Sequence, residues 1–183
     1  MDKDESLIET AISSESIYNG KIIKVFRDTV RLPDEKEALR EVVRHPGAVC
    51  VVPVTDRGEI LCVRQFRYPF SRVTTEIPAG KLDHIGEDHA AAARRELLEE
   101  TGASCSELRF IGELYTSPAI LDEVIYMYLA TGLRFGETHF DDDEFIEPIS
   151  VPFGKMKEMI LSGEIKDAKT QAAVLKAALL LGY

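Results

Sequence analysis

The sequence predicts one α+β domain, on three observations. Its first half is rich in β-branched residues, arranged in short runs that turn signals separate. Its second half contains a long run of strong helix formers. No long Ser/Gly linker or internal repeat interrupts the 183 residues. A chain of this length buries roughly 70% of the surface that its unfolded form exposes, so one core without disulfide or metal staples is expected.

The strands of the first half are expected at residues 20–32, 38–46, 48–54 and 59–66. Pro33-Asp34 and Asp56-Arg57-Gly58 supply turns between them. We expect this half to form an antiparallel sheet, with the strands before Gly47 as a small separate sheet. Further strands are expected near 76–78, 108–115, 124–130 and 146–151.

The best predicted helix spans residues 87–101, where four consecutive alanines precede Arg94 and Gly102 ends the run. Two more helices, at 153–162 and 168–181, are expected to close the chain. We therefore predict N-terminal strands over residues 1–46 and a catalytic domain over 47–183.

The net charge of the chain restricts which molecules it can bind. Twenty-two basic and thirty-two acidic side chains give a net charge of −10, which repels nucleic acid and anionic membranes. A phosphorylated partner would therefore need divalent cations at its site.

Location can be predicted from the cysteines and the N-terminus. The three cysteines, Cys50, Cys62 and Cys105, show no CxxC spacing and are expected to be buried thiols. No stretch approaches the roughly 20 apolar residues of a spanning helix, and the first five residues do not resemble a signal peptide. We expect a protein of the reducing cytoplasm.

Three carboxylates should share one face of the predicted helix. At about 100° per residue, Glu96, Glu99 and Glu100 fall within an arc roughly 100° wide. Leu98, Ala90 and Ala91 lie on the opposite side. Like charges at these spacings repel, so a cation is expected beside them. We expect this face to be exposed, so that Glu100 contributes little to stability.

Arg95 precedes Glu99 by four residues and can hold that carboxylate. Glu96 and Glu100 are then left to bind metal, and hard oxygen ligands favour Mg²⁺ or Mn²⁺. The alternative is a solvated acidic helix face, which is what most Glu-rich helix surfaces are. The loop with Gly80 and Gly86 favours the metal site, because loop carbonyls can complete it.

The segment from Arg95 to Ala103, with Glu87 eight positions before Arg95, resembles the Nudix box. That pattern is Gly-x5-Glu-x7-Arg-Glu-U-x-Glu-Glu-x-Gly-U, where U is aliphatic. This sequence departs from it once, since six residues instead of five separate Gly80 from Glu87. The extra residue lies before the helix and should leave the carboxylate geometry intact.

The resemblance covers nearly the whole chain and is greatest to bacterial ADP-ribose pyrophosphatases. It is carried by Arg40-Glu41 to Val49, Val63 to Arg67, Glu76 to Asp83, Tyr115 to Pro118, Asp143 to Glu147 and Asp167 to Thr170. It implies a Nudix-type α/β/α sandwich with a mixed sheet and an N-terminal antiparallel strand extension. It also implies Mg²⁺-dependent hydrolysis of ADP-ribose to AMP and ribose 5-phosphate, by a homodimer whose N-terminal strands are swapped.

The resemblance assigns the metal ligands and the base. Glu96 and Glu100 become side-chain ligands of two or three Mg²⁺ ions, and the carbonyl of Ala79 becomes another. Arg95 and Glu99 complete the catalytic group within the box. Glu144 is expected to reach the site as a metal ligand or as the base for the attacking water, with Asp142 as the fallback.

Substrate-binding residues follow from the same resemblance. Arg67 is expected at the diphosphate, because a guanidinium suits phosphate oxygens, although a surface charge is the plainer interpretation. The remaining candidates are Glu41, His45 and its neighbour Arg44 for adenine and phosphate, Glu123 for the terminal ribose, and Tyr18 or Phe26 for stacking on adenine. Aromatic residues in strands are more often core residues.

Two other functions remain open. The box alone would equally serve a Nudix pyrophosphatase acting on another nucleoside diphosphate derivative, a nucleoside triphosphate or capped RNA. The residues outside the box favour a nucleotide sugar, and the net charge disfavours RNA. Non-catalytic nucleotide-sensing Nudix modules typically lose box carboxylates, and here all are present.

Overall fold

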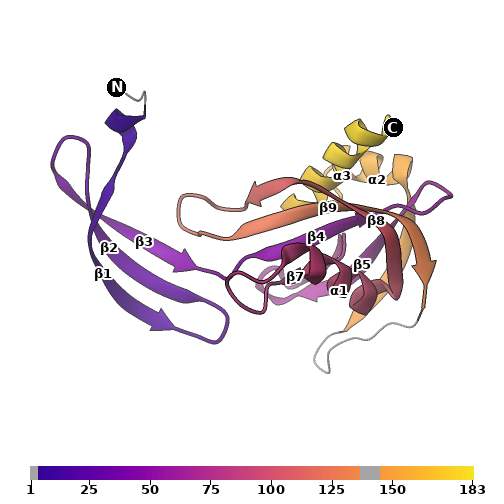
Figure 1. The fold of residues 1–183 in the computed structure, drawn as a ribbon, viewed down its shortest axis with the longest axis horizontal. Coiled ribbons are helices and arrows are strands. Elements are labelled where there is room, and N and C mark those ends of the chain that lie inside the picture. Colours follow the sequence, from indigo (N-terminus) through magenta and orange to yellow (C-terminus); the bar gives the residue numbers. More distant parts are fainter. Residues whose placement is uncertain (1–3, 137–144) are drawn as a thin grey trace. The chain divides into compact units, whose positions relative to one another are not determined.

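The computed structural model describes residues 4–136 and 145–183, and the chain divides into two compact units. The first unit comprises the residues up to Pro46 together with Ser117–Glu123. The second comprises Gly47–Thr116 and Val124–Tyr183. Figure 1 shows both units and labels their helices and most of their strands.

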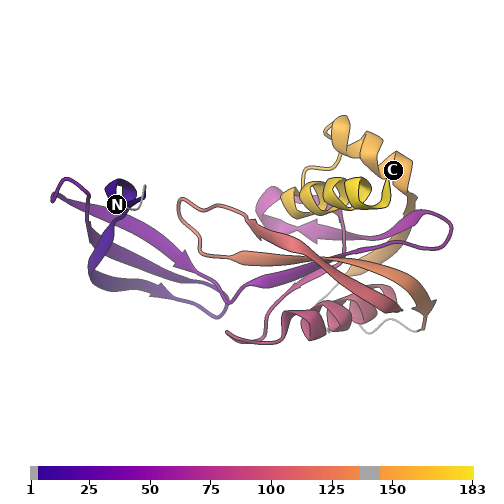
Figure 2. The ribbon, with the colours of Figure 1, turned by 45° about the horizontal axis from the view of Figure 1, so that its top comes forward.

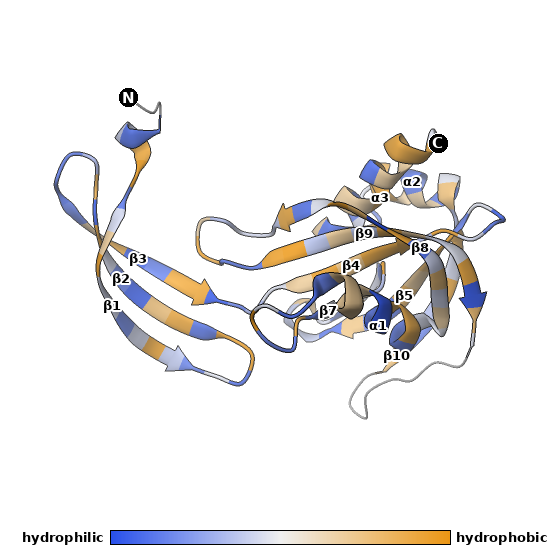
Figure 3. Cartoon of the chain, viewed as in Figure 1, coloured by the Kyte–Doolittle hydropathy of each residue, from blue (hydrophilic) through white to orange (hydrophobic). Residues whose placement is uncertain are grey.

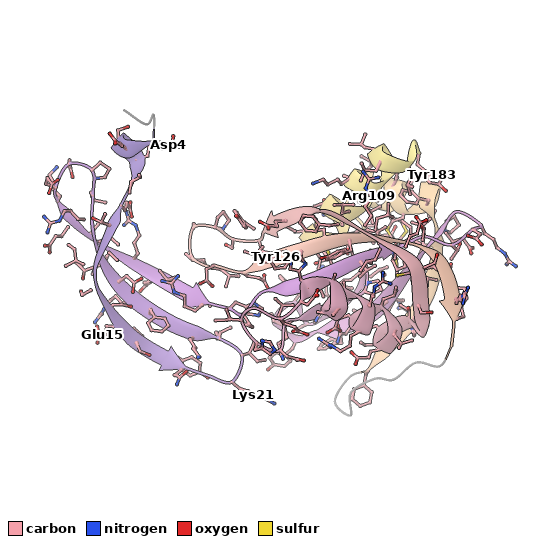
Figure 4. All side chains as sticks on the ribbon, in the orientation of Figure 1. Asp4, Glu15, Lys21, Arg109, Tyr126 and Tyr183 are labelled. Carbon is pink, nitrogen blue, oxygen red and sulfur yellow. The ribbon has the colours of Figure 1, made fainter. Side chains whose placement is uncertain are left out.

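The first unit is a three-stranded antiparallel sheet in the order β1-β2-β3. A short 3-10 turn at Glu5–Leu7 precedes β1 (Thr10–Asn19), β2 (Lys24–Arg31) and β3 (Glu37–Arg44). All ten residues of β1 are exposed, among them Glu15, which Figure 4 labels. The predicted strands at 20–32 and 38–46 correspond to β2 and β3, whereas β1 was not predicted.

The segment Ser117–Glu123 joins this sheet at the end of β3. The N–H of Val43 donates to the carbonyl of Ile120 at 2.7 Å, and the N–H of Asp122 donates to the carbonyl of Val43 at 3.1 Å. The connection between two later strands therefore becomes part of the N-terminal unit.

The second unit contains two sheets. The strands are β4 (Ala48–Pro53), β5 (Glu59–Arg67), β6 (Arg72–Glu76), β7 (Ala79–Lys81), β8 (Ala103–Tyr115), β9 (Val124–Phe135) and β10 (Ile146–Pro152), with a 3-10 turn at Tyr68–Phe70. Their orders are β7-β4-β9-β8 and β10-β5-β6. The expectation of an antiparallel sheet is wrong for β4, which runs parallel to β9 with Cys50 opposite Met127. Local patterns cannot reveal a partner so far along the chain.

Helices cover both faces of the four-stranded sheet. Figure 2 shows α1 (His89–Thr101) on one side, and α2 (Phe153–Leu161) and α3 (Ala168–Leu181) on the other. All six residues of β4, which Figure 3 shows as largely apolar, are buried. Because successive strand residues face opposite sides, Cys50 packs toward α2 and α3, while Val49 and Val51 pack toward α1. The predicted α/β/α sandwich is confirmed.

Helix α1 has a cap at each end. The Asp88 carboxylate accepts hydrogen bonds from the N–H groups of Ala90 and Ala91. Gly102 ends the helix with a φ of 67°, a left-handed conformation that favours glycine, and its N–H donates to the carbonyl of Leu98. The stop at Gly102 is confirmed, and the helix begins two residues later than predicted.

The face that α1 buries differs from the prediction. The buried residues are Ala92, Ala93, Leu97 and Glu100. Leu98, which was expected opposite the carboxylates, is 40% exposed, and Glu100, which was expected to be exposed, is only 5% exposed. Two small alanines let the helix lie close to the sheet, and that closeness buries Glu100 on the same arc. The expectation that Glu100 adds little stability assumed an exposed side chain, and the side chain is buried.

No helix within the described ranges is long and apolar enough to cross a membrane. All three cysteines are free thiols, with Cys50 and Cys62 buried and Cys105 half-buried. Burial raises the pKa of the Cys50 and Cys62 thiols to about 12.

Candidate functional site

The site begins where the chain passes from β6 to β7. This loop brings Ala79 against the last turn of α1, and the N–H of Ala79 donates to Glu100 Oε2 at 3.0 Å. Glu100 is thereby held at the edge of the core by a backbone group. Glu100 and Ala79, predicted as metal ligands from separate segments, are neighbours in the structure.

Gly80 leaves the space that the Glu96 carboxyl group occupies. A Cβ atom on residue 80 would overlap the carboxyl group of Glu96. The segment with Gly80, which was predicted to help complete a metal site, thus lies close to a predicted metal ligand. The side chains of Glu96 and Glu100 therefore both reach the loop at Ala79 and Gly80.

Arg95 compensates the negative charge of the carboxylates on α1. Its Nη1 contacts Glu99 Oε2 at 3.1 Å, as predicted, and also Glu96 Oε1 at 2.7 Å. Arg95 therefore also engages Glu96, a contact that the spacing did not predict. Its Nη2 lies 3.7 Å from Glu87 and 3.9 Å from Asp83, and is buried without a hydrogen bond.

Glu76 is the centre of a buried ion-pair network that sequence reasoning missed. Its side chain is 4% exposed and takes two hydrogen bonds of 2.8 Å from Arg67, through Nε and Nη2. Thr74 donates to it at 2.7 Å, and Lys169 of α3 also contacts it. Burial would raise the pKa of Glu76, but the bond from Arg67 and the charge of Lys169 lower it to about 2.

Arg67 is thus bound to Glu76 at two of its three guanidinium nitrogens, while its side chain remains 39% exposed. Burial alone would lower the pKa of Lys169, but Asp167 and Glu76 raise it, so the ammonium stays charged. One sequence signal could have indicated Glu76, namely an acidic residue at the end of a strand directly before Ile-Pro-Ala-Gly.

The other predicted substrate residues belong to the first unit. His45 Nδ1 lies 3.4 Å from Glu123 Oε1, so these two residues are brought together. Arg44 contacts two carboxylates, Asp122 at 3.2 Å and Asp28 at 3.4 Å. Glu41 is exposed on β3, opposite Arg27 of β2.

The two stacking candidates differ in exposure. Tyr18 is 57% exposed and Phe26 is half-buried, so Tyr18 is not a core residue. Glu144 and Asp142, the predicted base and its fallback, lie outside the described residues.

The donor atoms present suit a hard divalent cation. Within residues 4–136 and 145–183, no group of three or more His, Cys, Asp or Glu side chains is placed to hold a metal ion. Two carboxylates, those of Glu96 and Glu100, lie beside the backbone of Ala79 and Gly80. This set fits Mg²⁺, which keeps several waters and uses few protein carboxylates together with substrate phosphates.

Sequence comparison agrees with this geometry. Residues 44–173 match the model of the NUDIX domain, and residues 9–43 match that of the nucleoside diphosphate sugar hydrolase N-terminal domain. The chain belongs to the Nudix family. Enzymes of this family generally use divalent metal ions.

Individual relatives span almost the whole chain. An ADP-ribose pyrophosphatase of Bacillus subtilis is 44% identical over 172 residues, which cover 93% of this chain and 92% of the relative. A methanol dehydrogenase activator of Bacillus methanolicus is 40% identical, covering 91% and 90%. A solved structure described as the crystal structure of ADP compounds hydrolase superimposes with a TM-score of 0.83 at 20% identity, covering 95% and 94%, and supports the fold.

Proposed function

We propose that this protein hydrolyses the diphosphate of ADP-ribose and related ADP-sugars, giving AMP and ribose 5-phosphate, with two or three Mg²⁺ ions. One observation carries the proposal: the carboxylates of Glu96 and Glu100 meet the backbone of Ala79 and Gly80 in one place. The 44% identity with an ADP-ribose pyrophosphatase over nearly the whole chain supports the choice of substrate.

Each group has a role in this proposal. Divalent cations bound there would neutralise the charge that grows on the leaving phosphate and lower the pKa of a bound water. Glu96, Glu100 and the Ala79 carbonyl hold the cations, while Arg95 offsets the repulsion between Glu96 and Glu99. Glu144 orients the attacking water, with Asp142 as the fallback.

Arg67 is proposed to bind the diphosphate through Nη1, the guanidinium nitrogen that Glu76 does not occupy. Glu76 fixes the plane of the guanidinium in this arrangement. A fixed plane reduces the entropy lost when a phosphate binds.

Glu41, Arg44, His45 and Glu123 are proposed to bind the adenosine and the terminal ribose. We also propose that residues 1–46 form the swapped element of a homodimer. Exposed apolar side chains on the first sheet support this, namely Ile12, Ile17, Tyr18 and Leu39. A cytoplasmic location stays a prediction from the cysteines. The lack of nucleic-acid or membrane partners also stays a prediction, supported by the net charge of −10.

A second candidate function is hydrolysis of another nucleotide sugar. A GDP-mannose pyrophosphatase of Salmonella choleraesuis is 34% identical over 160 residues, covering 78% of this chain and 79% of the relative. A purely nucleotide-sensing role is disfavoured, because every box carboxylate is present.

The deciding experiment is a substrate panel assayed with Mg²⁺ and again with excess EDTA. The panel contains ADP-ribose, ADP-glucose, GDP-mannose, diadenosine polyphosphates and nucleoside triphosphates. We expect the highest kcat/KM with ADP-ribose and no turnover in EDTA. A preference for GDP-mannose would select the second function, and full activity in EDTA would contradict a metal-dependent site.

A further inference from the structure

The start of α3 is tied to the loop that carries Ala79. Asp167 caps the helix, and its Oδ2 accepts from the N–H of Thr170 at 2.9 Å and from the Thr170 hydroxyl at 2.6 Å. Thr170 is fully buried. Its hydroxyl has a single proton, and that proton is given to Asp167.

The hydroxyl oxygen is therefore oriented as an acceptor. It takes the N–H of Ile77 at 3.0 Å. Ile77 is itself fully buried, so its N–H has no water to replace this partner. Asp167 also lies 3.1 Å from Lys169, the ammonium that contacts Glu76. Glu76, the last residue of β6, and Ile77, the first residue after it, are thus held by two residues of α3.

The next two positions are held by other elements. The carbonyl of Pro78 accepts from the N–H of Val51 on β4 at 2.9 Å. The N–H of Ala79 donates to Glu100 of α1. The backbone from Ile77 to Ala79 is therefore fixed in turn by α3, β4 and α1. Loss of the bond at Ile77 would remove one of the three anchors that place the backbone just before the Ala79 carbonyl, and would leave the bonds to β4 and α1.

We propose that Thr170, oriented by Asp167, is a positioning residue that sets the place of the Ala79 carbonyl and so tunes the affinity of the divalent-cation site. This inference rests on the proposed function, in that a cation binds at Ala79, Glu96 and Glu100. Thr170 itself contacts neither cation nor substrate. It acts through the backbone of Ile77.

The test measures Mn²⁺ binding to the whole protein without substrate, by electron paramagnetic resonance of the free ion. Thr170→Val keeps the shape of the side chain and removes the hydroxyl. We expect it to weaken Mn²⁺ binding about 10-fold, the usual scale for groups that orient metal ligands. Thr170→Ser restores the hydroxyl and should bind Mn²⁺ within about twofold of wild type.

Val174→Ala is the matched control. Val174 is fully buried one turn further along α3 and belongs to the same core. Its truncation should lower Tm at least as much as Thr170→Val does, but leave Mn²⁺ affinity unchanged. If Val174→Ala weakens Mn²⁺ binding as much as Thr170→Val does, the effect reflects a general loss of stability, and the inference is overturned. Unchanged affinity in Thr170→Val would also overturn it.

If Thr170→Val does not fold, the variant Asp167→Asn tests the same inference. Asparagine still caps a helix but accepts from the hydroxyl without a charge. We expect Mn²⁺ binding about threefold weaker, with a lower Tm because Asp167 also pairs with the buried Lys169. Unchanged affinity would overturn the inference. A wild type that binds no Mn²⁺ and turns over no nucleotide sugar would instead contradict the proposed function. If the wild type is active and Thr170→Val binds Mn²⁺ with wild-type affinity, only the positioning role of Thr170 is contradicted.

Discussion

Glu100 serves both the fold and the proposed chemistry. Its carboxylate is 5% exposed and accepts from the N–H of Ala79. Glu100→Gln retains an oxygen for that N–H, so we expect kcat to fall by about 10²-fold or more with a small drop in Tm. Glu100→Ala should remove activity and also cost about 1–3 kcal/mol, because the N–H is left unpaired. Turnover of ADP-ribose and urea denaturation measure the two effects. Equal stability loss in both variants would contradict this division.

The proposed role of Glu144 in orienting the attacking water can be tested by kinetics. If it orients the attacking water, Glu144→Gln should lower kcat by about 10²-fold or more and leave KM nearly unchanged, since the group acts in the transition state. Asp142→Asn is the matched control and should have a much smaller effect. The reverse ranking would transfer the role to Asp142. Nearly normal kcat in both variants would instead assign the orientation of the water to a residue of the Nudix box, with Glu99 as the next candidate.

The residues of the site were predictable only where they are close in sequence. Arg95 and Glu99 share one helix, so spacing alone predicted their contact, and the structure has it at 3.1 Å. Spacing did not predict the contact between Arg95 and Glu96, which depends on rotamers. The network of Arg67, Glu76 and Lys169 was missed. Arg67 and Glu76 meet across the β5–β6 hairpin, and Lys169 joins them from 93 positions further along the chain.

Strand β7 lacks a side chain at Gly80, next to the Glu96 side chain of α1. Gly80→Ala would place a methyl group where the Glu96 carboxyl lies. That carboxyl is the end of a flexible side chain and can move aside, so stability should change little. Activity should fall by about 10-fold or more, because a proposed metal ligand is displaced. Gly154→Ala on α2 is the control, since a Cβ there meets nothing within 4 Å. Gly80→Ala with normal kcat/KM would contradict this assignment.

The network linking β5, β6 and α3 should make stability depend on pH. The pKa of Glu76 is lowered to about 2 from an ordinary 4.5, so its contribution is complete above about pH 4.5 and is lost as pH falls toward 2. The size of this contribution is roughly 3 kcal/mol. Urea denaturation should therefore show a gap between wild type and Glu76→Gln that narrows from pH 5 to pH 2.5. Glu158→Gln, at an exposed site on α2, is the control. A gap that stays constant with pH would refute this role for Glu76.

The elements were predicted best where the pattern was local. Helix α1 was predicted from its helix formers and Gly102, and its terminus is confirmed. Strand β1 was missed because all ten of its residues are exposed, so burial imposes no alternation on the sequence. The parallel pairing of β4 with β9 was also missed, because pairing partners are chosen by tertiary packing.

The whole molecule is expected to be a dimer through its N-terminal strands. Leu39 on β3 is 63% exposed, and a charge there should oppose an apolar interface. We expect a wild-type dimer at micromolar concentration in sedimentation, and a monomer with reduced activity for Leu39→Glu. Leu179→Glu, at an 85% exposed position on α3, is the matched control and should remain dimeric. A fully active wild-type monomer would contradict the proposal.

The hydrogen bond from Ile77 to Thr170 joins residues that lie 93 positions apart in the chain. During synthesis, the ribosome must add all of those residues before the bond can form. At typical rates of 5–20 residues per second, that takes roughly 5 to 20 s. Throughout this interval the N–H of Ile77 lacks its native partner. The bond that holds the backbone before Ala79 can therefore form only after Thr170 has been added to the chain and has left the exit tunnel.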